Sequence, residues 1–334
     1  MDVSLLLSLT DRVPLLAARP GPAAVPATAP DAAPDAARAD RLDRWARAAG
    51  LAPGAARCDL LAARLFPGAP AGRVELLARW LVWALALDDA LDRPPLGDSG
   101  TGVRALYDDL LAALRRGRPS PGARPLESAL VALWHATVRA PDGPELSRDW
   151  RRRFLQHLGE HRDGCAEEAV NRRTGTVPGP AGYPALRRRA AAPYLFDLAE
   201  PVLGAELPPA LAAAPAWRAL LDGVADILAW CNDLASYDAE RERGDRHNHV
   251  AVLGEAYGFG AANAARSVAD RIAERAGDVA AAARTLPATL ERLRFTAAEQ
   301  AVTERTVQAL LDAPRVHLDW LRESGRHAAL AGAR

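Results

Sequence analysis

The sequence contains no lysine, because all 42 of its basic residues are arginine. A phosphate-binding site in this chain must therefore be built from guanidinium groups, which bind oxyanions through forked N–H donors. The same absence excludes a lysine Schiff base or a lysine general base. The 42 basic residues balance 42 acidic ones, and this neutral charge argues against nonspecific binding to nucleic acid or another polyanion.

Cysteine is scarce as well. Cys58, Cys165 and Cys231 are odd in number, far apart and not arranged as CxxC pairs, so they form neither a disulfide framework nor a zinc site. This usage fits a reducing cytoplasm. No uninterrupted apolar run approaches the ~20 residues of a membrane span. The N-terminal stretch MDVSLLLSLTDR carries Asp2 and lacks the basic region of a signal peptide.

The chain also lacks alternating β patterns and fixed-period repeats. Prolines and alanines dominate residues 13–38, and we expect residues 1–40 to be a flexible N-terminal segment. From about residue 41, long Ala/Leu/Arg segments with helical spacing are separated by Pro/Gly breaks such as RPPLGDSG (93–100) and TGTVPGPAGYP (174–184). The prediction is an all-α fold, a single-domain bundle of roughly ten or more helices.

One apolar stretch, WLVWALALDDALDRPP (80–95), ends in three acids. On a helix, Leu85 precedes Asp88 or Asp89, and then Asp92, at intervals that continue the apolar stripe. Asp88 and Asp92 are one turn apart and repel each other, and the helix dipole disfavours acids at this end. A hard cation bound through carboxylate oxygens, with Mg²⁺ foremost, would offset both costs. The alternative is a solvated acidic helix end.

A second stretch, RALLDGVADILAWCNDLASYDAERERGD (218–245), changes character in the same way. Asn232, Ser236 and Glu240 are four residues apart, and each step of four advances only about 40° around a helix. They therefore lie on one narrow face, which continues an apolar stripe and offers three oxygen donors suited to Mg²⁺. Asp233 stands beside Asn232 as a supporting group. The alternative is a helix whose polar face emerges here.

Together the two motifs resemble those of bacterial class I terpene synthases, the terpene cyclases. Asp88-Asp89-Ala90-Leu91-Asp92 matches that family's DDxxD motif, and the residues from Asn232 to Glu240 match its NDxxSxxxE motif. The segments RLFPGAPAGRVELLARWLVW, WRRRFLQHLGEHRDGCAEEAVNRRTG and NHVAVL are similar to family sequence as well. The resemblance covers roughly residues 41–330, which it identifies as the catalytic domain, and it implies the family's helical bundle around an apolar active-site cavity.

The resemblance also implies diphosphate-binding residues. The stretch YPALRRRAAAP (183–193) matches the family's sensor segment and places the sensor at Arg188, with Arg187 as the alternative register. The effector glycine of the family falls on Ala192, whose carbonyl would serve the same purpose at a break before Pro193. Ala239 stands where the family often has lysine before the glutamate.

Near the C-terminus, LDWLRESGRH supplies Trp320, Arg326 and His327, with histidine in place of the family's tyrosine. A histidine can still donate a hydrogen bond to a phosphate oxygen. We expect Arg188, Arg326 and His327 to act on the diphosphate. Arg187 and the backbone of Ala192 are expected to contribute to its binding.

The resemblance further implies three Mg²⁺ ions and an allylic isoprenoid diphosphate that ionises in a dry cavity. Aromatic residues make up only 5% of the chain, and leucines 85 and 87 stand where relatives often have phenylalanine. The candidate lining residues are Trp83, Leu85 and Trp320, followed by Phe196 and Trp230. Farnesyl diphosphate is the default substrate and geranylgeranyl diphosphate the main alternative, as for a diterpene synthase.

Three alternative functions are compatible with parts of this sequence. A chain-elongating prenyltransferase would carry a second Asp-rich motif, which this chain lacks. A non-enzymatic helical scaffold would have no reason to place oxygen donors on core stripes. A cyclase fold without activity is the third, given the departures at positions 192, 239 and 327. The sequence leaves the choice between a monomer and a homodimer open.

Overall fold

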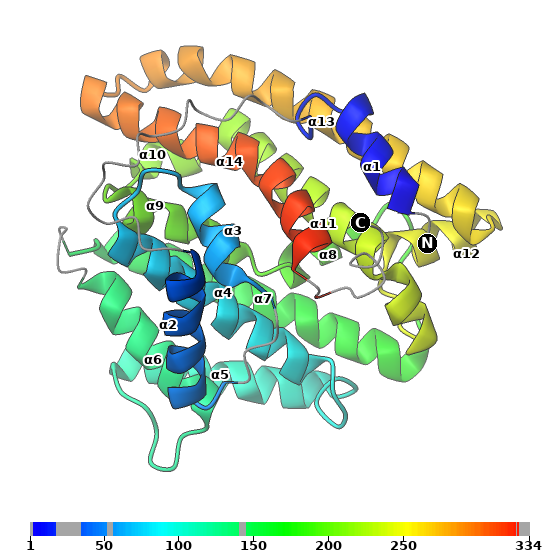
Figure 1. Ribbon diagram of the computed structural model, residues 1–334, viewed down its shortest axis with the longest axis horizontal. Coiled ribbons are helices and arrows are strands. Elements are labelled where there is room, and N and C mark those ends of the chain that lie inside the picture. The colour runs from blue at the N-terminus through cyan, green and yellow to red at the C-terminus, as the bar shows by residue number, and fades with distance from the viewer. Residues whose placement is uncertain (1–2, 18–34, 52–55, 140–144, 325, 327–334) are drawn as a thin grey trace. The chain divides into compact units, whose positions relative to one another are not determined.

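The computed structural model describes residues 3–17, 35–51, 56–139, 145–324 and 326. All regular structure within these ranges is helical, which confirms the predicted all-α fold (Figure 1). Contacts divide the chain into two compact units, and each is described by itself. Unit 1 comprises Met1–Pro20, Gly175–Ala191 and Leu207–Arg334, and unit 2 comprises Gly21–Thr174 and Ala192–Glu206.

Unit 2 contains the first acidic motif, at the C-terminal end of helix α4. Helix α5 packs along α7, and α4 packs against α3 and α6. The elements of this unit are α2 (Asp35–Ala48), α3 (Cys58–Leu65), α4 (Ala71–Leu91), α5 (Gly100–Arg116), α6 (Pro125–Val138), α7 (Arg148–Thr174), the 3-10 helix η1 (Pro193–Leu198) and α9 (Ala199–Leu203).

Several aromatic side chains of unit 2 form one connected cluster in its core. The Phe154 ring lies 5.3 Å from the rings of Trp80 and Trp150 and 5.6 Å from that of Tyr194. Trp83 meets Tyr194 edge-on at 6.0 Å between ring centroids. These five side chains are all fully buried. Contacts between these rings, several of them edge-to-face, help to stabilise the unit.

Buried ion pairs attach η1 and α9 to α7. Arg153 donates from Nε to Asp197 at 2.9 Å and also contacts Glu200, and both carboxylates are almost fully buried. His157 Nδ1 lies 2.7 Å from the second oxygen of Asp197. Buried carboxylates are tolerated only when they are paired in this way. The pairs fix the segment that follows Ala192.

Unit 1 contains the second motif, which lies on helix α11. Helix α11 packs against α13 and α14, and α12 packs on α13 (Figure 1). The elements are α1 (Val3–Arg12), α8 (Tyr183–Ala190), α10 (Pro209–Ala212), α11 (Pro215–Glu242), α12 (His249–Tyr257), α13 (Ala261–Arg292) and α14 (Ala297–Glu323).

The N-terminal segment differs in part from the flexible stretch expected over residues 1–40. Helix α1 packs on α13, and Leu9, Val13 and Leu16 are buried. Arg12 pairs with Asp270 of α13 at 2.6 Å. Proline stops the helix as predicted, but the apolar residues around it still bury their side chains. Residues 18–34 of that stretch lie outside the described residues.

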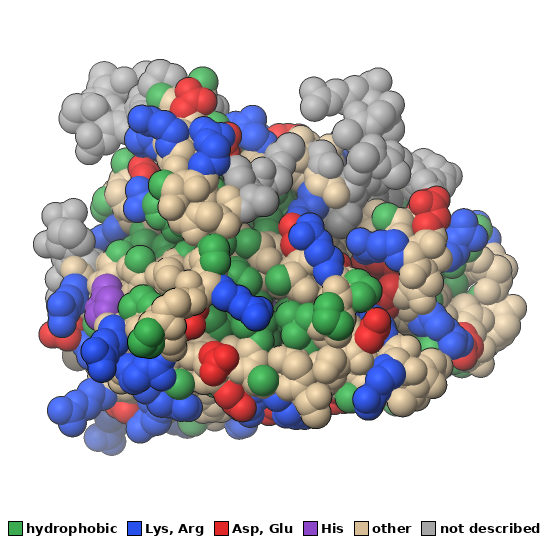
Figure 2. All heavy atoms as spheres, turned by 90° about the horizontal axis from the view of Figure 1, so that it is seen from below, with side chains coloured by type: hydrophobic (Ala, Val, Ile, Leu, Met, Phe, Trp, Pro, Cys, Tyr) green, Lys and Arg blue, Asp and Glu red, His purple; other side chains and the backbone are tan. Residues whose placement is uncertain are grey.

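The surface carries both charge signs. On the face in Figure 2, arginine and acidic side chains both appear, with apolar side chains between them. The described helices include none that is both long enough and apolar enough to span a bilayer. Cys58, Cys165 and Cys231 are free thiols, and all three are buried.

Gly223 sets the close approach of α11 and α13. A Cβ atom at this position would lie 2.4 Å from Cγ2 of the buried Val279. We predict that Gly223→Ala lowers the free energy of unfolding by about 1–3 kcal/mol, because the overpacked helices must separate. Urea denaturation followed by circular dichroism measures the change.

The matched control is Gly277→Ala on α13, where a Cβ would meet no atom within 4 Å. Alanine is favoured over glycine in an exposed helix interior, so this variant should gain about 0.5–1 kcal/mol. Equal stability of the two variants would contradict the proposed packing limit.

Candidate functional site

The first acidic motif lies at the C-terminal end of α4. The helix ends at Leu91, and Asp92 is its C-cap, with its backbone N–H donating to the carbonyl of Asp88 at 3.0 Å. Asp88 and Asp92 are exposed and Asp89 is half-buried. All three are expected to bind metal, and they present accessible carboxylate oxygens within unit 2.

The orientation expected for these acids needs a correction. The fully buried face of α4 runs through Trp80, Trp83, Leu87 and Leu91, not through Leu85 and the acids. Helix α4 is apolar on most of its circumference, so a 3.6-residue period fits more than one stripe. The acids border the buried face instead of continuing it.

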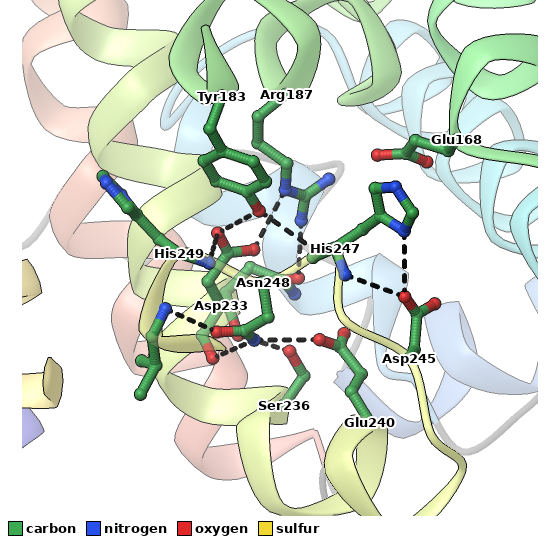
Figure 3. Close-up of polar contacts among 12 residues, drawn as sticks. Glu168, Tyr183, Arg187, Asp233, Ser236, Glu240, Asp245, His247, Asn248 and His249 are labelled. Carbon is green, nitrogen blue, oxygen red and sulfur yellow. Dashed lines mark hydrogen bonds and ion pairs between the residues drawn. The ribbon is translucent and has the colours of Figure 1, made fainter. Parts of the chain in front are cut away.

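The second motif lies on the last turns of α11, in unit 1. Ser236 is 2% exposed, and Asn232 and Glu240 are partly buried, so this face points inward as predicted. The Ser236 hydroxyl donates to the backbone carbonyl of Asn232 at 2.9 Å. Figure 3 shows Ser236 and Glu240 on the same side of the helix, facing Asn248. The three predicted oxygen donors thus share one face.

Asn248 completes this cluster, and its function was not anticipated from the sequence. Its Nδ2 donates to Glu240 Oε2 at 2.8 Å and to the Asp233 carbonyl at 2.7 Å (Figure 3). Its Oδ1 accepts the N–H of Val250 at 2.9 Å and caps α12. The signal was present in NHVAVL, where an asparagine preceding a helical run is typical of an N-cap.

Asp233 is the centre of the unit 1 site. Its carboxylate is fully buried and accepts hydrogen bonds from the Tyr183 hydroxyl at 2.7 Å, Arg187 Nε at 2.9 Å and the His249 backbone N–H at 3.1 Å (Figure 3). Three donors, one of them a cation, satisfy a carboxylate that would otherwise be very costly to bury. The group expected to support Asn232 therefore organises α8, α11 and α12 together.

Neighbouring arginines of α8 bind different partners. Arg187 Nη2 donates to Asn232 Oδ1 at 3.1 Å, so Arg187 is the arginine in contact with the second motif. Arg188 instead binds Asp226, with Nη1 at 2.7 and 2.8 Å from the two carboxylate oxygens. Consecutive residues on a helix point about 100° apart, which explains why neighbours meet different partners.

Electrostatics at the second motif favour a bound cation. Burial, with a smaller contribution from the Asp233 charge, raises the pKa of Glu240 to about 7. The hydrogen bond from Asn248 and the charge of Arg187 oppose this rise. Burial also lowers the pKa of His249 to about 4 and keeps its imidazole neutral. A carboxylate that is hard to ionise and an adjacent buried carboxylate both gain from a nearby positive charge.

The donor set fits a hard divalent ion. Amide, hydroxyl and carboxylate oxygens from Asn232, Ser236 and Glu240 lie on one face, and oxygen is the ligand atom that Mg²⁺ prefers. Within the described ranges, no group of three or more His, Cys, Asp or Glu side chains is arranged to hold a metal ion. The second motif would therefore depend on its amide and hydroxyl oxygens.

Ala192 adopts the backbone conformation of a glycine. It has φ 52° and ψ 57°, and its carbonyl accepts the N–H of Leu195 at 3.0 Å where η1 begins. The break predicted at this position is present. An L-residue in the left-handed region is strained, so the alanine adopts the geometry at an energetic cost.

The candidate lining residues and the C-terminal candidates lie on different elements. Trp83 donates from Nε1 to the Leu126 carbonyl at 2.8 Å within the unit 2 aromatic cluster, and Leu85 is half-exposed. Trp320 is buried and stacks on His317 at 5.5 Å, and Trp230 is buried against His249. Phe196 is half-buried. The Arg326 backbone N–H donates to Ser324 Oγ at 3.4 Å. His327 lies outside the described residues.

Comparison with known sequences identifies the class of protein. The model of terpene synthase family 2, described as the C-terminal metal-binding region, matches residues 79–278, which include both acidic motifs. The chain therefore belongs to this family and is an enzyme of the bacterial class I terpene synthase type, which confirms the resemblance.

Characterised relatives of this chain are terpene synthases as well. The chain is 35% identical to a (+)-T-muurolol synthase of Roseiflexus castenholzii over 196 residues, which are 58% of each chain. It is 29% identical to a pentalenene synthase of Streptomyces avermitilis over 304 residues, 88% of each chain. It is 28% identical to a (−)-delta-cadinene synthase of Streptomyces clavuligerus over 272 residues, 81% of each.

Solved structures share the fold. A linalool/nerolidol synthase from Streptomyces clavuligerus superposes with a TM-score of 0.75 at 25% identity, over 87% of this chain and 96% of that one. Germacradien-4-ol synthase from Streptomyces citricolor gives 0.73 at 24% identity, over 86% and 93%. The helical architecture of class I terpene synthases is therefore that of this chain.

The raised pKa of Glu240 predicts a pH-dependent stability. In the unfolded chain this carboxyl ionises near its usual pKa of about 4.3, whereas in the folded protein it keeps its proton up to about pH 7. The folded state binds more protons in this window, so the contribution of Glu240 to stability is lost as the pH rises from about 4.3 to 7. We predict that Glu240→Gln becomes more stable than the wild type by up to about 3 kcal/mol between pH 5 and pH 8.

Urea unfolding at each pH measures this difference. Glu242→Gln, at an exposed position two residues later, is the control and should follow the wild-type curve. Parallel pH curves for Glu240→Gln and the wild type would contradict the prediction.

The strain at Ala192 predicts that glycine is better there. The left-handed conformation costs an alanine roughly 1–2 kcal/mol, while glycine loses about 0.5–1 kcal/mol in backbone entropy, so Ala192→Gly should gain roughly 0.5–1 kcal/mol. Ala191→Gly, at a residue with φ −96°, should instead lose stability. Thermal unfolding of both variants tests the pair, and a melting temperature that falls in both would refute the strain.

Proposed function

We propose that this chain is a Mg²⁺-dependent terpene cyclase. It ionises a linear allylic isoprenoid diphosphate, with farnesyl diphosphate foremost, and cyclises the carbocation to a terpene with release of diphosphate. The observation that carries the proposal is the row of Asn232, Ser236 and Glu240 on one inward face of α11, with the Arg187 guanidinium bound to Asn232. Oxygen donors for a cation and a cationic donor for phosphate occur there together.

The metal-binding residues proposed for this function are those of the two motifs. Asp88, Asp89 and Asp92 in unit 2 and Asn232, Ser236 and Glu240 in unit 1 would hold the ions, three in number. Bound Mg²⁺ supplies electrostatic stabilisation of the diphosphate as it leaves. Around it, Asn248 keeps Glu240 oriented, and Asp233 fixes the start of the second motif through Arg187.

The diphosphate oxygens would be bound by arginine. Arg187 and Arg188 lie on α8, and Arg326 follows α14, with His327 as a further donor. Guanidinium forks match phosphate geometry, and this lysine-free chain has no other strong cation to offer. The carbonyl of Ala192 would contribute to binding through its dipole, since a backbone dipole stabilises positive charge without supplying a nucleophile.

A carbocation survives only where water is excluded and the walls are apolar. Trp83 and Leu85 of α4 and Trp320 of α14 are the proposed lining residues. The Trp83 ring belongs to the buried aromatic cluster of unit 2, and aromatic faces stabilise cations through their quadrupoles. Leucines at 85 and 87 leave more room than phenylalanines would.

Farnesyl diphosphate is the substrate that the relatives favour. The Roseiflexus relative and an eudesmol synthase of Streptomyces viridochromogenes, 27% identical, are both described as cyclising (2E,6E)-farnesyl diphosphate. Geranylgeranyl diphosphate is the second candidate because of leucines 85 and 87. A chain-elongating prenyltransferase is disfavoured by the amide and hydroxyl in the second motif.

The proposal also covers the catalytic domain, the cellular compartment and the partners of the protein. Residues 41–330 would form the catalytic domain, and three free buried thiols support a reducing cytoplasm. No polyanion partner is expected from the balanced charge. A monomer and a homodimer are both compatible with this function.

Loss of either motif should abolish product formation. We predict that Asp88→Ala and Asn232→Ala each lower turnover at least about a hundredfold, because the leaving diphosphate loses its electrostatic stabilisation. Incubation with Mg²⁺ and the C10, C15, C20 or C25 diphosphate, followed by mass spectrometry of hexane-soluble products, measures turnover and identifies the substrate. Chelation with EDTA should stop the reaction, and added Mg²⁺ should restore it.

Asp109→Ala, at an exposed acid of α5, is the control and should leave turnover unchanged. Circular dichroism shows that each variant keeps its helices. Unchanged turnover in both motif variants would disprove the assignment. Product formation only when isopentenyl diphosphate is added would indicate chain elongation instead.

A further inference from the structure

We propose that Asp226 is a positioning residue that holds the Arg188 guanidinium ready for the diphosphate. Asp226 belongs to neither metal motif, and it lies on α11 six residues before Asn232. The inference rests on the proposed function, because it takes Arg188 as a diphosphate-binding group.

Asp226 is a buried acid with two arginine partners. It is 2% exposed, and Arg188 Nη1 from α8 lies 2.7 and 2.8 Å from its two oxygens. Arg275 Nε from α13 donates to Oδ2 at 2.9 Å. One arginine would neutralise the charge of a buried carboxylate. The second therefore does more than neutralise, since it fixes the plane of the carboxylate.

Arg275 is itself held in place. Its Nη1 binds Asp278 at 3.1 Å, one turn along the same helix. The close approach at Gly223 brings α13 near enough, since a Cβ at Gly223 would lie 3.7 Å from Arg275 Nε. The Asp226 carboxylate is thus fixed by α13 on one side and presents its oxygens to Arg188 on the other.

Arg188 is tethered at one nitrogen and accessible elsewhere. Its side chain is 26% exposed, and its Nε lies 3.8 Å from the exposed Asp222. Within the described part of the chain, Arg188 donates its side-chain hydrogen bonds from Nη1 and none from Nη2. A long side chain that is already oriented loses less rotamer entropy when it meets an anion. Arg188 is therefore anchored without being fully occupied.

Arg187 shows the contrasting arrangement. Its Nε and Nη2 are bound to Asp233 and Asn232, so the fork is engaged by the second motif. Asp226 and Asp233 are seven residues apart, two turns of α11, and each orients one of two neighbouring arginines. The anchor of Arg188 and the metal row share one rigid helix, with Asp226 about 9 Å along the axis from Asn232.

The test is Asp226→Asn, which keeps the shape of the side chain and removes its charge. Calorimetry with inorganic diphosphate and Mg²⁺ measures binding, and steady-state kinetics with farnesyl diphosphate separate KM from kcat. We expect diphosphate affinity to fall and KM to rise about tenfold with kcat nearly unchanged, because a binding interaction made in both ground and transition states is weakened. A purely structural defect would lower kcat and thermal stability at constant KM.

A double-mutant cycle isolates the tether. In an Arg188→Ala background, Asp226→Asn should cause no further loss of diphosphate affinity, because Asp226 acts through Arg188. Asp270→Asn, which alters an exposed acid of α13 paired with Arg12, is the matched control and should leave KM unchanged.

The outcomes are separable. A wild-type protein that turns over substrate while Asp226→Asn keeps the wild-type KM overturns this inference alone, as does full additivity in the cycle. A wild-type protein that neither binds diphosphate with Mg²⁺ nor forms product overturns the proposed function and this inference with it. Should Asp226→Asn fail to fold, Asp226→Glu keeps the charge but displaces the carboxylate. A raised KM in that variant supports the inference, and an unchanged KM overturns it.

Discussion

The buried carboxylate of Asp233 is the interaction on which the unit 1 site depends. It has no access to solvent, and the Tyr183 hydroxyl, the Arg187 guanidinium and the His249 backbone N–H replace the water that it loses. A buried charge is stable only with this complete set of partners. Because these donors come from α8 and α12, their requirement fixes both elements against α11 at the place where the second motif begins.

Because the chain has no lysine, the geometry of this site depends on guanidinium groups. Every cation in the site is a guanidinium, which can bind one partner through one nitrogen and leave another nitrogen for a second. Arg187 joins Asp233 to Asn232 in this way, and Arg188 binds Asp226 through Nη1 while its Nε lies near Asp222. A lysine ammonium, as a point charge on a flexible stem, would not orient its partners in the same manner. The composition and the geometry of the site are therefore connected.

The predictable features were those that depend on neighbouring residues. Helical periodicity and Pro/Gly breaks predicted an all-α chain, and the four-residue spacing of Asn232, Ser236 and Glu240 predicted their common inward face. The same rule failed for the acids of α4, because a helix apolar on most sides has no unique stripe. The helix over residues 3–12 was not anticipated either, because it is stabilised by burial of Leu9 against distant helices.

By itself the sequence determined which oxygen donors and which arginines are available, and in what order they follow along each helix, since helix geometry depends only on local backbone angles. It also identified the family through its paired motifs. Only the tertiary structure decided that Arg187 reaches Asn232 while Arg188 reaches Asp226, that Asn248 joins Glu240, and that Trp83, Phe154 and Tyr194 meet in the core of unit 2. These pairings join residues as far apart in the chain as Trp83 and Tyr194. They result from the packing of helices, which local sequence does not specify.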